Sequence, residues 1–202
     1  MDLTDILLLL LFISFSVAYM VKLILLKTGD KINANVLSKG NKESTVKRVE
    51  VLVKVSSFIW ILTQLLEILF HKTISSYTSS FFNNPLVSYA AVLITALGVG
   101  IFISAIISMK SSWRVGIDKA VRTELITKGI YRISRNPAFM GFDLMTAGLF
   151  LAYPNMLTLL VLLVFPLSLH LLVLQEEKHL VSMFGEEYAS YRKKAPRYLL
   201  FL

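Results

Sequence analysis

Residues 138–174 read AFMGFDLMTAGLFLAYPNMLTLLVLLVFPLSLHLLVL, which is two apolar segments joined by a Tyr-Pro-Asn sequence at 153–155. Proline and asparagine favour tight turns, so segments 138–153 and 156–174 are predicted to form an antiparallel helical hairpin. Each is near the roughly 20 residues that cross a bilayer as an α-helix. Three more apolar blocks of similar or greater length precede them: 3–26, 51–70 and 86–109.

The composition also indicates a membrane protein. Of the 202 residues, 55% are hydrophobic and 17% are charged, against about 45–50% and about 25% in soluble domains. We therefore predict an all-α, polytopic membrane protein, a single membrane domain over 1–202 with five transmembrane helices. The absence of cysteine excludes disulfides and thiolate chemistry. The three histidines have no metal-ligand spacing, so no metal site is predicted.

Positive charges predict the orientation. All but one of the Lys and Arg residues between the blocks or after the last one fall on the same side, and only Lys72 falls on the other. Cytoplasmic loops carry such an excess, so the N-terminus is predicted outside and the C-terminus in the cytoplasm. Because these charges flank membrane spans, we do not expect a nucleic-acid partner. The cations on the predicted cytoplasmic side are Lys27, Lys31, Lys39, Lys42, Lys47, Arg48, Lys110, Arg114, Lys119, Arg122, Lys128, Arg132, Arg135, Lys178, Arg192, Lys193, Lys194 and Arg197.

Two segments on the cytoplasmic side are unlike ordinary connectors. Residues 125–141 read LITKGIYRISRNPAFMG, and residues 176–196 read EEKHLVSMFGEEYASYRKKAP. Together they resemble the isoprenylcysteine carboxyl methyltransferase family and its phospholipid-methyltransferase relatives. The shared pattern is Thr-x-Gly-x-Tyr, then Arg-Asn-Pro-x-aromatic-x-Gly opening a helical hairpin, then Glu-Glu, Phe-Gly-x-x-Tyr-x-x-Tyr and a basic tail.

The resemblance implies methyl transfer from S-adenosylmethionine at the cytoplasmic face, through a cofactor-binding region at 120–197 without a Rossmann domain. It implies a lipophilic acceptor that enters from the bilayer, foremost an isoprenylcysteine-type carboxylate. Asn136 stands where eukaryotic carboxyl methyltransferases have His, and the segment 113–116 is more similar to prokaryotic members, which indicates a prokaryotic cell membrane. The alternatives are a phospholipid amine or small thiol acceptor, an NADPH-dependent sterol-reductase-like enzyme, a non-catalytic scaffold and a transporter.

The matched motifs imply roles for individual residues. Arg135 and Glu177 are the candidate catalytic residues. The candidate acceptor-binding residues are Phe139, Asp143 and Arg197. Those expected at the cofactor are Thr127, Gly129, Tyr131, Arg135, Asn136, Pro137, Glu176, Glu177, Tyr188, Tyr191 and Arg192.

The chemistry of these residues allows both structural and functional interpretations. Asn136 and Pro137 are suited to begin a helix, Asn by accepting bonds from free N–H groups and Pro by its fixed φ; such an end also attracts a carboxylate. Arg135 can form paired hydrogen bonds with a carboxylate or extend to the interface. Glu176 and Glu177 are either a solvated helix end or a site for the amino group or ribose of the cofactor.

A second group of residues is similarly ambiguous. The stripe of Leu180, Phe184, Tyr188 and Tyr191 predicts an amphipathic C-terminal helix, on the membrane surface or over the cofactor, with a bend at Gly185. Gly98 and Gly100 resemble a cofactor motif. However, Gly100 also belongs to a series of small residues spaced four apart, which favours close packing between helices. The series is Ala96, Gly100, Ser104 and Ser108.

Charged residues inside the apolar blocks need an explanation of their own. Asp143 must face the bundle interior or a cavity, paired with Lys110, Arg135 or Arg192, and act as a base or as a structural acid. Glu67 lies near the end of its block and is expected to extend toward the interface.

Overall fold

The computed structural model describes residues 1–117 and 123–199, and in that part of the chain every named element is helical. This confirms the all-α class. Two of the cations used for orientation, Lys119 and Arg122, lie outside the described residues. The elements are α1 (Leu3–Thr28), α2 (Ser44–Ile74), α3 (Pro85–Ser108), η1 (Lys110–Ser112), η2 (Gly129–Arg132), α4 (Pro137–Ala152), α5 (Met156–Phe184) and α6 (Glu186–Lys194).

Four helices, α1, α2, α3 and α5, are long and apolar enough to cross a membrane. Helix α4 has 16 residues, about 24 Å at the usual rise per residue. This is shorter than the roughly 30 Å hydrocarbon core of a bilayer. A fifth crossing by α4 therefore stays a prediction.

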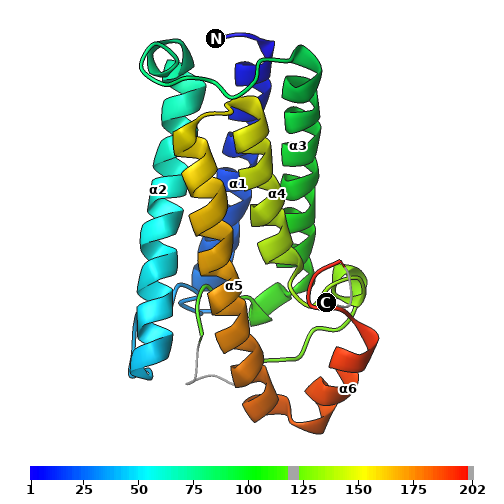
Figure 1. Ribbon diagram of the computed structural model, residues 1–202. Coiled ribbons are helices and arrows are strands. Elements are labelled where there is room, and N and C mark those ends of the chain that lie inside the picture. Colours follow the sequence, from blue (N-terminus) through cyan, green and yellow to red (C-terminus); the bar gives the residue numbers. More distant parts are fainter. Residues whose placement is uncertain (118–122, 200–202) are drawn as a thin grey trace.

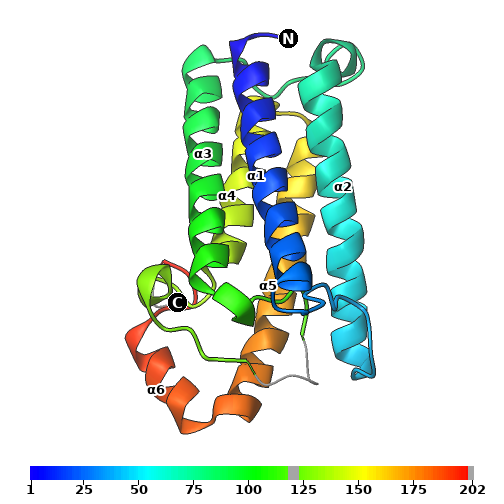
Figure 2. The ribbon, with the colours of Figure 1, turned by 180° about the vertical axis from the view of Figure 1, so that it is seen from behind.

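The helices form one bundle, with α1 on one side and the α4–α5 hairpin on the other (Figures 1 and 2). The N-terminus lies at one end. At the opposite end lie the segments 29–43, 109–117 and 123–136, helix α6 and the segment 195–199. We call this second end the polar end. It is the end that the charge pattern assigns to the cytoplasm.

Aromatic side chains fill the centre of the bundle. The ring of Phe15 from α1 lies 4.9 Å from that of Phe102 in α3 and 5.8 Å from that of Trp60 in α2. Phe102 contacts Phe142 in α4 at 5.2 Å, and Trp60 stacks on Phe165 in α5 at 5.2 Å. Edge-to-face and offset contacts at such distances are favourable beyond area burial alone. Helices α1 to α5 thus share one aromatic core.

Helices α3 and α4 approach closely at glycines. A Cβ added to Gly98 would lie 2.7 Å from the carbonyl oxygen of Gly141, and one added to Gly141 would lie 2.8 Å from that of Gly98. Gly100 is exposed, with nothing within 4 Å of an added Cβ. Gly100 therefore does not make the close helix contact that was expected of it within the described bundle. Gly98, two residues earlier, makes the close contact with α4 because it faces that helix.

The turn of the hairpin is held by buried polar contacts. Asn155 caps α5 by accepting bonds from the backbone N–H of Leu157 and Thr158, and its amide donates to Glu67 Oε1 at 2.7 Å. The hydroxyl of Tyr153 donates to Asp5 Oδ1 at 2.8 Å. Glu67 is fully buried, so the expectation that it extends to the interface is wrong. Its carboxylate instead ties α2 to the hairpin.

At the polar end, Glu50 of α2 joins the two long connections. Its fully buried carboxylate accepts bonds from Lys42 Nζ at 2.7 and 2.8 Å and from the backbone N–H groups of Ser38 and Ile117, each at 2.8 Å. A buried charge is stable only with such partners. Glu50 therefore ties the segment before α2 to the segment that follows η1.

The glycine contact predicts unequal effects of two substitutions. Gly98→Leu should destabilise the protein by about 1–3 kcal/mol, the usual range for overpacking, because no space exists beside Gly141. Gly100→Leu should leave stability nearly unchanged, since its side chain enters open space. Thermal unfolding in detergent measures both, and equal losses would contradict the assigned packing.

Candidate active site

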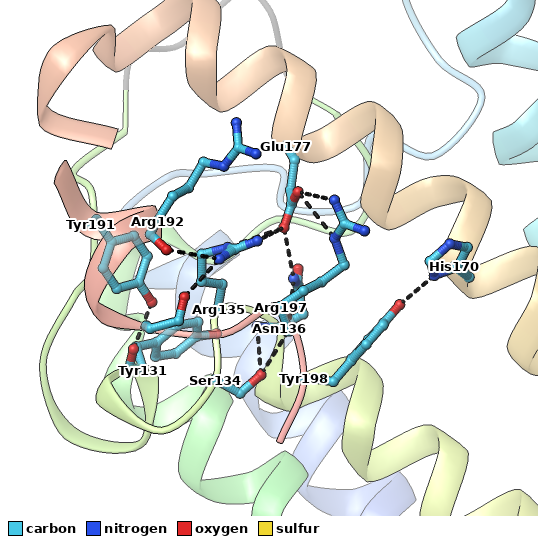
Figure 3. A network of polar contacts seen from close by, with 11 residues as sticks. Tyr131, Ser134, Arg135, Asn136, His170, Glu177, Tyr191, Arg192, Arg197 and Tyr198 are labelled. Atoms are coloured by element: carbon cyan, nitrogen blue, oxygen red, sulfur yellow. Dashed lines mark hydrogen bonds and ion pairs between the residues drawn. The ribbon is translucent and has the colours of Figure 1, made fainter. Parts of the chain in front are cut away.

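Glu177 lies at the centre of a network of polar contacts at the polar end (Figure 3). Its Oε1 accepts bonds from Arg135 Nε at 3.2 Å and Nη2 at 3.0 Å, and from Asn136 Nδ2 at 3.4 Å. Its Oε2 accepts from Arg197 Nε at 3.2 Å and Nη2 at 2.8 Å. Two guanidinium groups therefore converge on one carboxylate that is 6% exposed. Residues far apart in sequence meet here.

The beginning of α4 presents Arg135 and Asn136 to this carboxylate. Pro137 is the first residue of the helix, as the sequence predicts. Asn136 occupies the capping position, but its side chain caps no backbone N–H. The expectation of an Asn cap is therefore wrong. Its amide instead donates to Glu177 and to the carbonyl of Arg197 at 3.2 Å, so the side chain is held toward Glu177 and away from the first turn of α4.

The segment 195–199 runs along the site and is held mainly through its backbone. The N–H of Arg135 donates to the carbonyl of Pro196 at 2.9 Å, and its Nη1 donates to that of Ala195 at 2.6 Å. Ser134 Oγ donates to the carbonyl of Arg197 at 2.9 Å. Sequence reasoning missed Ser134, whose role depends on the position of a segment more than 60 residues away.

Three tyrosines line the side of the network that faces α6. We call Tyr131, Tyr188 and Tyr191 the tyrosine wall. Tyr191 donates its hydroxyl to the carbonyl of Tyr131 at 2.6 Å, and both rings are buried. The hydroxyl of Tyr188 is buried close to Arg135 and Glu177, but it has no hydrogen bond of good geometry with a described residue. Burial raises the pKa of Tyr188 to about 12 and also raises the pKa values of Tyr131 and Tyr191. All three hydroxyls therefore stay protonated at neutral pH.

The predicted stripe packs inside the protein. Tyr188, Tyr191 and Ala195 form a small cluster against Leu125, Leu180 and Phe184. The bend at Gly185 is confirmed: this residue ends α5 with φ 51°, a left-handed value that favours glycine. Helix α6 therefore turns back toward the 123–135 region. Contact of α6 with a membrane surface stays a prediction.

Four residues expected at the cofactor lie outside the hydrogen-bond network or contribute little to it. Thr127 is half-buried in the chain before η2, and Gly129 begins η2 beside Ser108. Glu176, although adjacent to Glu177, takes no part in the contacts with the two arginines. Arg192 is exposed and contributes only its carbonyl, 3.4 Å from Arg135 Nη1.

The candidate acceptor residues of α4 lie on its half-buried side. Phe139 packs against the aromatic core. Asp143 has a buried Oδ1 without a hydrogen-bond partner in the described part of the chain. The predicted pairing of Asp143 with Lys110, Arg135 or Arg192 is therefore wrong, because Arg135 is bound to Glu177 instead.

A tyrosine–histidine pair lies close to Asp143 and was missed by sequence reasoning. The hydroxyl of Tyr198 lies 2.8 Å from His170 Nδ1 of α5 (Figure 3). Burial, and then the nearby charge of Asp143, raise the pKa of Tyr198 to about 12. Nothing in the spacing of these residues connects them, since the folded segment 195–199 brings Tyr198 to α5.

Residues 86–187, about half of the chain, match the sequence model of a family described as phospholipid methyltransferase. The chain belongs to this family. It is also similar to the protein-S-isoprenylcysteine O-methyltransferase of Schizosaccharomyces pombe, with 40% identity over 73 residues. That match covers 36% of this chain and 31% of the S. pombe protein. The resemblance stated from the two motifs is confirmed, and the protein is a membrane protein of a methyltransferase family.

Matched tyrosine variants test the geometry of the wall. Tyr191→Phe removes the bond to the carbonyl of Tyr131 and should destabilise the protein by about 1 kcal/mol or more. Tyr188→Phe removes a buried hydroxyl that has no hydrogen bond of good geometry with the described residues, so the melting temperature should stay the same or rise. Thermal unfolding of the two variants in parallel checks this, and the reverse order would refute the hydrogen-bond assignment.

Proposed function

We propose that this protein transfers a methyl group from S-adenosylmethionine to the polar head of a lipophilic acceptor at the cytoplasmic face of a prokaryotic cell membrane. The observation that carries the proposal is the convergence of Arg135, Asn136 and Arg197 on Glu177 at the polar end of the bundle. Family membership supports the methyl-transfer part. The excess of Lys and Arg at this end supports the cytoplasmic orientation.

The residues present suit this cofactor. Its amino-acid end carries an ammonium group, which a carboxylate such as Glu177 binds through charge-assisted hydrogen bonds. The rings of Tyr188 and Tyr191 provide flat apolar faces of the kind that bind an adenine. The partnerless hydroxyl of Tyr188 offers one more polar contact. Bound S-adenosylmethionine supplies an electrophilic methyl group on a positively charged sulfur.

The work of the protein in such a transfer is positioning. An in-line displacement requires the acceptor atom and the methyl carbon on one axis in a site that excludes water. Arg135 and Asn136 hold Glu177 in place from the start of α4. Phe139 and Asp143 continue along the same helix into the bilayer region, so an acceptor lying beside α4 presents its head to the site.

An isoprenylcysteine-type carboxylate is the first candidate acceptor. The similar S. pombe protein is named for methylation of such a group. A carboxylate is anionic at neutral pH and needs no base before it attacks the methyl group. Lateral entry from the bilayer suits its apolar chain.

A lipid amine is the second candidate, and Asp143 favours it. The buried Oδ1 of Asp143 has no partner among the described residues, whereas an ammonium head would supply one. An amine must lose a proton before it can act as a nucleophile, and Asp143 is placed to accept that proton. The family description, phospholipid methyltransferase, is consistent with this acceptor.

Calorimetric titration of the detergent-solubilised protein tests the cofactor. We expect micromolar binding of S-adenosylmethionine and S-adenosylhomocysteine, and a loss of at least tenfold in affinity in Glu177→Gln, which keeps the shape of the side chain but not its charge. Glu187→Gln, an exposed acid in α6, is the control. Binding of NADPH alone would favour the reductase alternative, and no binding by folded protein would favour a scaffold.

Asp143→Asn distinguishes the two acceptors. With a lipid amine, methylation by the variant should fall by about 10²-fold, the contribution typical of a general base, while S-adenosylhomocysteine binding is retained. With an isoprenylcysteine analogue, the rate should stay within about threefold of wild type. Radiolabelled methyl incorporation into phosphatidylethanolamine and into a farnesylcysteine analogue measures both. An unchanged rate of amine methylation in the variant would exclude Asp143 as the general base.

A further inference from the structure

Arg197 is the guanidinium of the network that can exchange partners. Glu177 Oε1 is bound by Arg135 and Asn136, whereas its Oε2 is bound by Arg197 alone. The Arg197 side chain is 25% exposed and that of Arg135 is 9% exposed. A cation that takes the place of Arg197 at Oε2 therefore leaves every other bond of the carboxylate intact.

The backbone of Arg197 would stay in place during such an exchange. Its carbonyl accepts bonds from Ser134 Oγ at 2.9 Å and Asn136 Nδ2 at 3.2 Å, and the carbonyl of Pro196 accepts from the N–H of Arg135 at 2.9 Å. None of these bonds involves the Arg197 guanidinium. This group can therefore rotate away from Glu177 and still remain within side-chain reach of it.

Arg135 has less freedom. Besides its two bonds to Glu177, its Nη1 donates to the carbonyls of Ala195 at 2.6 Å and Arg192 at 3.4 Å. Rotation of this guanidinium would break its bonds to both carbonyls and leave Asn136 as the remaining donor to Glu177 Oε1. Leaving buried polar groups unpaired is unfavourable. The carboxylate-binding role that the sequence indicates for Arg135 is therefore better suited to Arg197.

We infer that the Arg197–Glu177 pair opens to bind the amino-acid end of the cofactor, with Glu177 Oε2 taking the ammonium group and Arg197 the carboxylate. This assignment rests on the proposed function. An amino-acid zwitterion brings one charge of each sign, so both members of the pair recover a partner. The planar guanidinium matches a carboxylate with two parallel bonds. Arg197 is thus a cofactor-binding residue, in place of the acceptor role indicated by the sequence.

Two thioether nucleosides test the assignment. S-adenosylhomocysteine carries the amino-acid group, and 5′-methylthioadenosine has the same adenosine and thioether without it. In calorimetric titrations, Arg197→Gln should weaken S-adenosylhomocysteine binding at least tenfold and change 5′-methylthioadenosine binding less than twofold. Arg197→Lys keeps the charge but not the planar guanidinium that forms two parallel bonds. It should show a smaller loss of affinity, and for S-adenosylhomocysteine alone. Lys194→Gln, an exposed cation of α6, should affect neither ligand.

The other outcomes overturn the assignment in distinct ways. Equal losses for both nucleosides would show that Arg197 only maintains the site. Tighter binding of S-adenosylhomocysteine in Arg197→Gln would show that the side chain competes with the cofactor. If Arg197→Gln does not fold, the same selective loss is required of Arg197→Lys. Failure of the wild-type protein to bind either nucleoside would refute the proposed function itself, and this assignment with it.

Discussion

A carboxylate buried at the edge of the apolar core requires positive partners, and Glu177 has two. The free energy of burying an ion is recovered only when its charge is paired and its lone pairs are hydrogen-bonded. For Glu177 the donors come from the start of α4 and from the segment 195–199. This requirement brings the start of α4 and the segment 195–199 together against α5 at the polar end of the bundle. The chemistry of the site and the folding of its surroundings therefore depend on the same contacts.

The network is fixed in space by the bundle beneath it. Gly98 and Gly141 let α3 and α4 approach closely, and the aromatic rings between helices α1 to α5 set their spacing. Asn155 and Tyr153 hold the turn of the α4–α5 hairpin from the other end. As a result, α4 begins where Arg135 can reach α5. In lipid, helices satisfy their own backbone groups, so polar side chains at the helix ends remain for function.

The site has an excess of one positive charge, from two arginines against one glutamate. Such a balance suits a ligand end that carries both signs better than a simple cation. The tyrosine wall next to it is apolar on its faces and protonated at its hydroxyls. Asp143, on the bilayer side, is the only acidic group we connect with the acceptor, and the Tyr198–His170 pair lies near it. In the proposed function, cofactor and acceptor chemistry are therefore separated along α4.

The apolar blocks predicted where α1 to α5 lie, because a helix that must bury its backbone bonds in lipid depends on local composition. The polar ends of α2 (Ser44–Ile74) and α5 (Met156–Phe184) extend beyond the predicted 51–70 and 156–174. The hairpin turn, the start of α4 at Pro137 and the two motifs were likewise readable from short stretches of chain. Side-chain partners were not. Asn136 donates instead of capping, Asp143 lacks the partner expected for it, Gly98 replaces Gly100 in the helix contact, and Arg197 binds Glu177. Each of these depends on which surfaces of distant helices face one another, and only the folded bundle decides that.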